Sequence, residues 1–275
     1  MVLDEKRSCR ICRRRPANTK EHFIPKAAGN RCRVDLLSVG QDGRPEPIRC
    51  TNGFHVPVLC SVCNNGICAT YARSYVQLIS AIQTSADLQS THGENLVSVD
   101  RFRPLEFTKH LISMFLCVQP WEPAPIWDSL QAFVLDPNAC LPPGAPRLFL
   151  YHSVGDVGRI VPCCCMLDLA TGSAAALAEV AWPPLGVVYA FDWHDKLRGL
   201  TEVTEWGHTD SAASLPLRLA LPSRQINTPF PLAFGTSSDV ALDEGRRLPV
   251  YLLHVPPEPT SPASIGALIT RSEQQ

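Results

Sequence analysis

The sequence predicts an α+β protein in which a small N-terminal module, held together by cysteines, precedes a β-rich domain. Three observations predict this. Short-spaced cysteine pairs stand near residue 10 and at residues 60–63, helical periodicity follows the second pair, and short apolar runs separated by Pro and Gly fill the chain beyond residue 137. Such runs are typical of strands and turns. We place the two units at residues 1–95 and 96–275.

The cysteine pairs organise the N-terminal module. Cys9 and Cys12 form one C-x-x-C, and Cys60 and Cys63 form a second. The N-terminus carries charges where a signal peptide needs an apolar segment, and no apolar run reaches the roughly 18 residues that span a bilayer. We therefore expect a cytoplasmic protein without a membrane segment. In such a chain the pairs indicate one structural Zn²⁺ held by four thiolates, with four buried free thiols as the alternative.

The elements of the first module follow from its residues in order. A short strand should end within KEHFIP, residues 20–25, and residues 27–54 resemble a loop because Gly and Pro interrupt them repeatedly. A helix should begin at Asn64 and fade near residues 85–87, since apolar residues recur there at helical spacing. Residues 91–100 should form the exit from the module.

The second unit should open with helices and continue with strands. Pro104 is expected at the first position of a buried helix, because the residues after it are apolar almost all round. A short helix should cover residues 126–134. Apolar runs then predict five strands, at residues 147–154, 159–169, 176–182, 186–192 and 248–255. Because 20 of the 25 prolines lie beyond residue 100, a turn-rich domain is favoured over a helical bundle.

The net charge of −1 conceals an uneven distribution. Residues 1–50 hold 12 Lys+Arg against 6 Asp+Glu, a net of +6, whereas the remainder holds 13 against 20, a net of −7. A basic segment around a metal site suits a polyanionic partner. Arg13, Arg14 and Arg15 follow the first cysteine pair, and guanidinium groups match phosphate oxygens, so we expect them to contact a nucleic-acid backbone. A solvated charged surface is the alternative.

The order C-x-x-C, E-H-x-x-P, C-x-x-C-N resembles the HNH endonuclease family over about residues 9–84. The resemblance implies a ββα-metal finger, in which two strands and a helix grip one divalent cation. It implies that His22 is the general base and that Glu21 and Asn64 hold a catalytic Mg²⁺ or Mn²⁺. Asn65 would be a neighbour of this site.

The chain departs from the family at one position. The family's middle asparagine, which braces the catalytic loop, falls at His55 here, and Asn52 is a nearby substitute. We therefore expect His55 to support the site mainly through the order of the loop.

The function implied by the resemblance is metal-dependent hydrolysis of DNA phosphodiester bonds, in a setting such as bacterial anti-phage defence or a mobile element. An imidazole can accept a proton from water near neutral pH, and carboxylate and amide oxygens suit Mg²⁺. The rival hypothesis is a non-catalytic zinc module that binds nucleic acid or a protein, and RNA stays open as a substrate. Residues 96–275 belong to no family that we recognise, and we expect them to select substrate, bind a ligand or regulatory partner, or mediate homo-oligomerisation.

Overall fold

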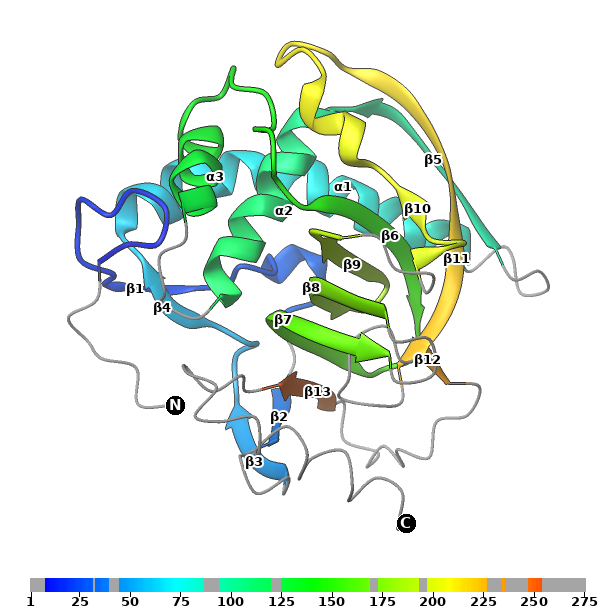
Figure 1. The fold of residues 1–275 in the computed structure, drawn as a ribbon. Coiled ribbons are helices and arrows are strands. Elements are labelled where there is room, and N and C mark those ends of the chain that lie inside the picture. The colour runs from blue at the N-terminus through cyan, green and yellow to red at the C-terminus, as the bar shows by residue number, and fades with distance from the viewer. Residues whose placement is uncertain are drawn as a thin grey trace.

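The computed structural model describes residues 8–31, 33–39, 45–86, 94–119, 125–168, 173–192, 197–226, 234–235 and 247–253. These residues form a mixed α+β fold with one large sheet, a separate two-stranded sheet and a group of helices (Figure 1). The predicted α+β class is therefore confirmed. Within this described part of the chain, no helix is both long and apolar enough to cross a membrane.

Two short strands that pair with each other and one helix shape the N-terminal part, and other elements separate the two strands along the chain. Strand β1 (Thr19–Glu21) pairs antiparallel with β4 (Val56–Leu59) to form the two-stranded sheet. β4 leads into a wider, π-type turn, η2 (Cys63–Cys68), which continues as helix α1 (Ala69–Ala86). The helix predicted from Asn64 is thus confirmed, and it ends where its periodicity fades.

The loop predicted for residues 27–54 is wrong over residues 33–39 and 45–50, while residues 32 and 40–44 lie outside the described residues. After a short helical turn, η1 (Lys26–Ala28), these two segments form an antiparallel pair of strands, β2 (Arg33–Val39) and β3 (Pro45–Cys50). β3 lies at the edge of the large sheet, where a strand tolerates prolines. β2 pairs in parallel with β13 (Arg247–Leu253), so the prediction failed because the partner strand lies at the far end of the chain.

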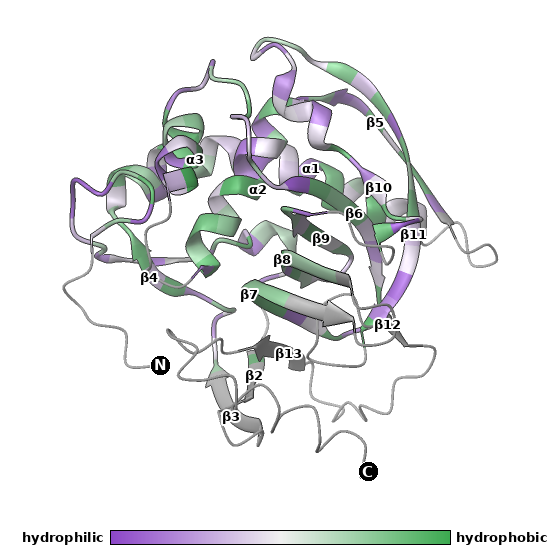
Figure 2. Cartoon of the chain, in the orientation of Figure 1, coloured by the Kyte–Doolittle hydropathy of each residue, from purple (hydrophilic) through white to green (hydrophobic). Residues whose placement is uncertain are grey.

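The large sheet holds eleven strands over the described residues, in the main order β12-β11-β6-β9-β8-β7-β13-β2-β3, with β10 beside β6 and β5 beside β11. Its strands not yet given are β5 (Glu94–Phe102), β6 (Arg147–Val154), β7 (Gly158–Asp168), β8 (Ser173–Trp182), β9 (Leu185–Ala190), β10 (Thr201–Glu202), β11 (Leu215–Ile226) and β12 (Phe234–Gly235). The five strands predicted from apolar runs are confirmed as β6, β7, β8, β9 and β13, while residues 169, 254 and 255 of the predicted runs lie outside the described residues. Every residue of β9 is buried, and this strand carries hydrophobic colour in Figure 2.

Strands β5 and β11 form a long ribbon that the sequence analysis missed. They pair antiparallel from Glu94 opposite Pro222 to Phe102 opposite Leu215, along one side of the molecule (Figure 1). Hydrophobic and hydrophilic residues alternate along both strands in Figure 2, as expected for strands with one covered face. The exit expected at residues 91–100 falls on β5 over residues 94–100, and residues 91–93 lie outside the described residues.

Helix α2 (Pro104–Val118) lies at the centre of the helical group. It packs against α1, α3 (Pro125–Leu135) and the short turn η4 (Thr204–His208). Pro104 occupies the first turn and nearly every residue of α2 is buried, which confirms both expectations for this helix. The short helix expected at 126–134 is confirmed as α3.

A buried lysine joins α2 to the end of α3. Lys109 Nζ donates hydrogen bonds to the carbonyl oxygens of Phe133 (2.5 Å), Asp136 (2.8 Å) and Ala139 (2.9 Å). The first of these carbonyls lies in the last turn of α3 and the other two follow the helix, where a cation also meets the negative end of the helix dipole. α3 is therefore held in a fixed place beside the N-terminal cysteines.

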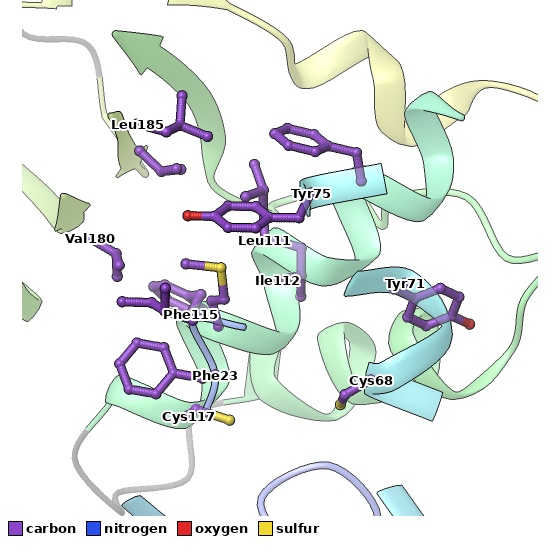
Figure 3. Close-up of a cluster of buried hydrophobic side chains, with 14 of the residues drawn as sticks. Phe23, Cys68, Tyr71, Tyr75, Leu111, Ile112, Phe115, Cys117, Val180 and Leu185 are labelled. Atoms are coloured by element: carbon purple, nitrogen blue, oxygen red, sulfur yellow. The ribbon is translucent and has the colours of Figure 1, made fainter. Parts of the chain in front are cut away.

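The largest core cluster draws on residues from both predicted units. Figure 3 shows Phe23 of the N-terminal part with Phe115 and Cys117 of α2 and with Val180 and Leu185 of the sheet, all members of this cluster. The predicted division between residues 95 and 96 falls within β5. That division stays a prediction, while the shared core places the N-terminal site directly on α2.

Candidate metal centre and catalytic loop

The four predicted zinc ligands lie together. The sulfur atoms of Cys9, Cys12, Cys60 and Cys63 all lie within 4.8 Å of one another, and Cys12 Sγ is 3.8 Å from Cys60 Sγ. A tetrahedral zinc ion with Zn–S bonds of about 2.3 Å places its thiolates about 3.8 Å apart. The cluster therefore has the size and the donor chemistry to hold a metal ion such as zinc.

Backbone hydrogen bonds shape the first cysteine knuckle. The N–H of Cys9 donates to Arg15 O (2.7 Å), and the N–H of Arg13 donates to Cys9 O (2.9 Å). Arg13 takes the left-handed conformation, with φ 52°, which lets the chain turn back sharply. The N–H of Arg10 donates to Val58 O (3.0 Å) and so ties this knuckle to β4, the strand that leads to the second pair.

The thiols sit in different electrostatic surroundings. Burial raises the pKa of Cys9 and of Cys63. Burial also opposes ionisation of Cys60, but the backbone N–H of Cys63 and the neighbouring thiols outweigh it and lower the pKa of Cys60 to about 7. Since cysteine binds metals as the thiolate, metal binding at this cluster must release protons.

Arg10, which stands between the ligands of the first pair, attaches the metal centre to the helices. Its Nη1 donates to the carbonyl of Gln119 at the end of α2, and Gln131 of α3 donates to Arg10 O (2.7 Å). Arg10 is buried, and its charge meets the negative end of α2. The sequence analysis did not single out Arg10, because these partners lie 109 and 121 residues away along the chain.

His22 directly follows β1 and is held by a backbone carbonyl. Its Nε2 lies 3.0 Å from Asn52 O. A carbonyl oxygen only accepts, so Nε2 carries the proton and the lone pair of the neutral ring lies on Nδ1. Burial lowers the pKa of His22 below its usual value, with Lys26 and His55 adding to the effect and the Asn52 hydrogen bond opposing it. The ring is therefore neutral at pH 7, as a proton acceptor must be.

His55 places a second imidazole beside the first. The two ring centroids are 5.3 Å apart and the planes are inclined by 39°. His55 Nδ1 lies 3.3 Å from Gly53 O, so the consecutive carbonyls of Asn52 and Gly53 each hold one nitrogen of one ring. Asn52 thus contributes its backbone to the loop, whereas the sequence analysis had offered it as a substitute for a bracing asparagine.

The residues predicted to hold a catalytic cation lie on β1 and on the helical turn. Glu21 is the last residue of β1, opposite Val56 of β4. Asn64 is half-buried in η2, and its N–H donates to Cys60 O (2.9 Å). π-type turns are frequent at functional sites. Among the described residues, no hydrogen bond or ring contact joins Asn64 to either histidine.

The other residues predicted for the site lie at the surface. Asn65 follows Asn64 on the exposed side of η2. Arg13, Arg14 and Arg15 are exposed at the end of the first knuckle, where a polyanion can reach them. A residue that the sequence analysis missed is the buried Asn30, whose side chain contacts both segments that carry the histidines. A single asparagine between a turn and a strand gives no periodic signal that could have marked it.

The chain has no match among the known proteins with which it was compared. The four thiols offer the donors that zinc prefers. No family model matches the chain, and no curated protein or solved structure matches it either.

Proposed function

We propose that this protein is a metal-dependent endonuclease of the HNH type that hydrolyses phosphodiester bonds in DNA. The observation that carries the proposal is the imidazole of His22, held at the end of β1 by Asn52 O with its lone pair on Nδ1. The pairing of β1 with β4, the continuation of β4 through η2 into α1, and the four-thiolate cluster support it. The basic segment at residues 1–50 suits a polyanionic substrate.

The chemistry assigned to the chain is proton transfer and positioning. His22 Nδ1 takes a proton from a water molecule as the water oxygen attacks phosphorus, and the bond from phosphorus to the leaving oxygen breaks. The leaving oxygen takes a proton from solvent, so atoms and charge balance. A positioned base of this kind accounts for about 10²- to 10⁴-fold of a rate enhancement. The hydrogen bond to Asn52 O keeps the imidazole in the tautomer that this step requires.

Glu21 and Asn64 are the proposed ligands of a catalytic divalent cation. A bound Mg²⁺ or Mn²⁺ would neutralise the negative charge that develops on the phosphate and on the leaving oxygen. In this proposal the four cysteines hold a separate zinc ion that stabilises the fold. A hydrogen bond from Arg10 N–H to Val58 O holds the first knuckle against β4, and β4 pairs with the strand that ends at Glu21. A zinc ion bound by the four thiolates would reinforce this contact.

A non-catalytic zinc module that binds nucleic acid or a protein partner is the second candidate. It is supported by the contacts through which Arg10 and Gln131 attach the first knuckle to α2 and α3, because these contacts give the cysteine cluster a structural role that needs no catalysis. It gives no role to the tautomer of His22 or to the adjacent His55. The two candidates predict different results in one assay.

The test is incubation of the full-length, zinc-loaded protein with supercoiled plasmid DNA and, separately, with single-stranded RNA. Each substrate is incubated with Mg²⁺, with Mn²⁺ or with EDTA, and zinc content is measured after the EDTA step. The proposal predicts nicked or linear DNA with either cation and none with EDTA. If the protein binds DNA but does not cleave it with either Mg²⁺ or Mn²⁺, the proposal is contradicted and the non-catalytic module is favoured. If it cleaves RNA but not DNA, the proposed substrate is wrong and RNA replaces it.

A further inference from the structure

Asn30 is buried between the two segments that carry His22 and His55. It lies just after η1, and its residue is 0% exposed. Its Nδ2 donates to Ile24 O (2.8 Å) and to Phe54 O (2.8 Å), and its Oδ1 accepts from the N–H of Phe54 (2.6 Å). The amide therefore uses both of its protons and its oxygen to join these two segments.

The partners of Asn30 stand next to the histidines along the chain. Ile24 comes two residues after His22, and Phe54 immediately precedes His55. Phe54 also comes two residues after Asn52, whose carbonyl holds His22 Nε2. The three hydrogen bonds of Asn30 therefore fix the position of the His22 ring relative to the carbonyl that orients it.

Gly53 shows how closely the loop fits around Asn30. Its φ is 78°, and a Cβ at this position would lie 2.2 Å from Asn30 O and 2.4 Å from Asn30 Oδ1. Only glycine allows the loop to approach the asparagine this closely. Phe23 and Phe54 are buried and pack edge to face with centroids 5.3 Å apart, and Asn30 itself is fully buried, so its amide is shielded from water.

We propose that Asn30 is a positioning residue for the imidazole of His22: it holds the loop so that Asn52 O takes the proton on Nε2 and the lone pair stays on Nδ1. A ring without this carbonyl would populate both tautomers and several orientations, and the attacking water would be without its base for part of the time. This inference rests on the proposed function for its effect on cleavage. Its effect on the ring of His22 does not depend on that function.

The test compares the full-length parent with Asn30→Asp and Asn30→Ser. The aspartate keeps the shape of the side chain but cannot donate either hydrogen bond, and the serine is smaller and uncharged. Asn18→Asp is the matched control, because it makes the same chemical change at an exposed residue just before β1. Zinc content and thermal unfolding select the variants that are folded.

The first measurement is of the tautomer of His22 by nitrogen-15 NMR of its ring at pH 8, with His22→Ala used to assign the signal. The parent and Asn18→Asp should show the proton on Nε2, and the Asn30 variants should show a mixture of tautomers. A parent ring with its proton on Nδ1 would overturn the inference, and this result needs no variant to fold.

The second measurement separates cleavage from binding. In the Asn30 variants the single-turnover cleavage rate at saturating plasmid should fall about 10- to 100-fold, because a small misplacement of a reacting group is this costly. The affinity for DNA should change by less than about threefold, since Asn30 is buried away from the phosphates. Folded variants with the parental tautomer and the parental rate would overturn the inference and leave the nuclease assignment intact. A parent that cleaves nothing would end the nuclease assignment, while the NMR result would still decide the role of Asn30.

Discussion

Arg13 Nη1 lies 2.5 Å from Asp128 Oδ1, so an arginine at the end of the first cysteine knuckle is paired with the first turn of α3. Both side chains reach solvent, with 36% of Arg13 and 72% of Asp128 exposed. An exposed ion pair of this kind contributes only about 0 to 1 kcal/mol. A phosphate group can therefore displace Asp128 from Arg13, and the pair gives a way to test the basic surface in both directions.

The exposed arginines should contact DNA phosphates. Replacing Arg13, Arg14 and Arg15 with Ala should weaken DNA binding and reduce the slope of log affinity against log salt by about 0.9 for each phosphate that is no longer neutralised. Asp128→Asn should strengthen binding, because it releases Arg13. DNA affinities measured from low to moderate salt test both predictions. Arg218 is an exposed arginine on β11, and Arg218→Ala serves as the control. A triple variant with an unchanged slope would mean that these arginines only solvate the surface.

The four-thiolate cluster should bind about one zinc ion per chain and stabilise the whole N-terminal part. Cys60→Ser should remove the zinc and lower the free energy of unfolding by about 3 kcal/mol or more, because the ion closes both knuckles. Metal analysis and urea denaturation measure the two effects. Cys140→Ser, at an exposed free cysteine, is the control and should change neither. Folded, active protein that contains no zinc would exclude the predicted metal centre.

His110 should make the protein sensitive to acid. Neither of its ring nitrogens makes a hydrogen bond within the described residues, its ring packs on Tyr75, and burial lowers the pKa of His110 to about 3. The unfolded chain takes up this proton near pH 6.5 and the folded chain does not. Stability is therefore full above about pH 6.5 and falls as the pH drops toward 3, by up to about 1.4 kcal/mol per pH unit.

The variant His110→Phe keeps a ring against Tyr75 and removes the titration. Compared with the parent, it should gain more stability at pH 5 than at pH 8, as measured by urea denaturation at both values. His208→Gln changes an exposed histidine and serves as the control. An equal effect of His110→Phe at the two pH values would show that folding does not lower the pKa of His110.

The parts of the site that the sequence predicts correctly are those encoded by short spacing. Each C-x-x-C closes a knuckle on its own, so the spacing predicts that Cys9 lies beside Cys12 and Cys60 beside Cys63. The structure confirms that all four cysteines lie together. Helices α1, α2 and α3 were predictable for the same reason, because their periodicity and Pro104 are local signals.

The parts that the sequence does not reveal depend on partners far along the chain. β2 pairs with β13, and Arg10 forms hydrogen bonds with Gln119 and Gln131. No local sequence pattern encodes contacts between such distant residues. The alternating leucines of β11 are typical of a strand. Pro216 and Pro222 argue against that assignment, because proline is rare inside strands. Asn30 was missed because its role depends entirely on where the segments around it meet.

The nuclease assignment is tested most directly by the rate at which His22→Ala cleaves plasmid DNA in the presence of Mg²⁺ or Mn²⁺, measured beside the parent and beside His208→Ala as a matched control. His22→Ala should keep its zinc and its affinity for DNA, because the zinc ligands and the exposed arginines are untouched. Its cleavage rate should fall about 100-fold or more, the usual contribution of a positioned general base, while His208→Ala cleaves like the parent. A His22→Ala protein that cleaves as fast as the parent would contradict the account.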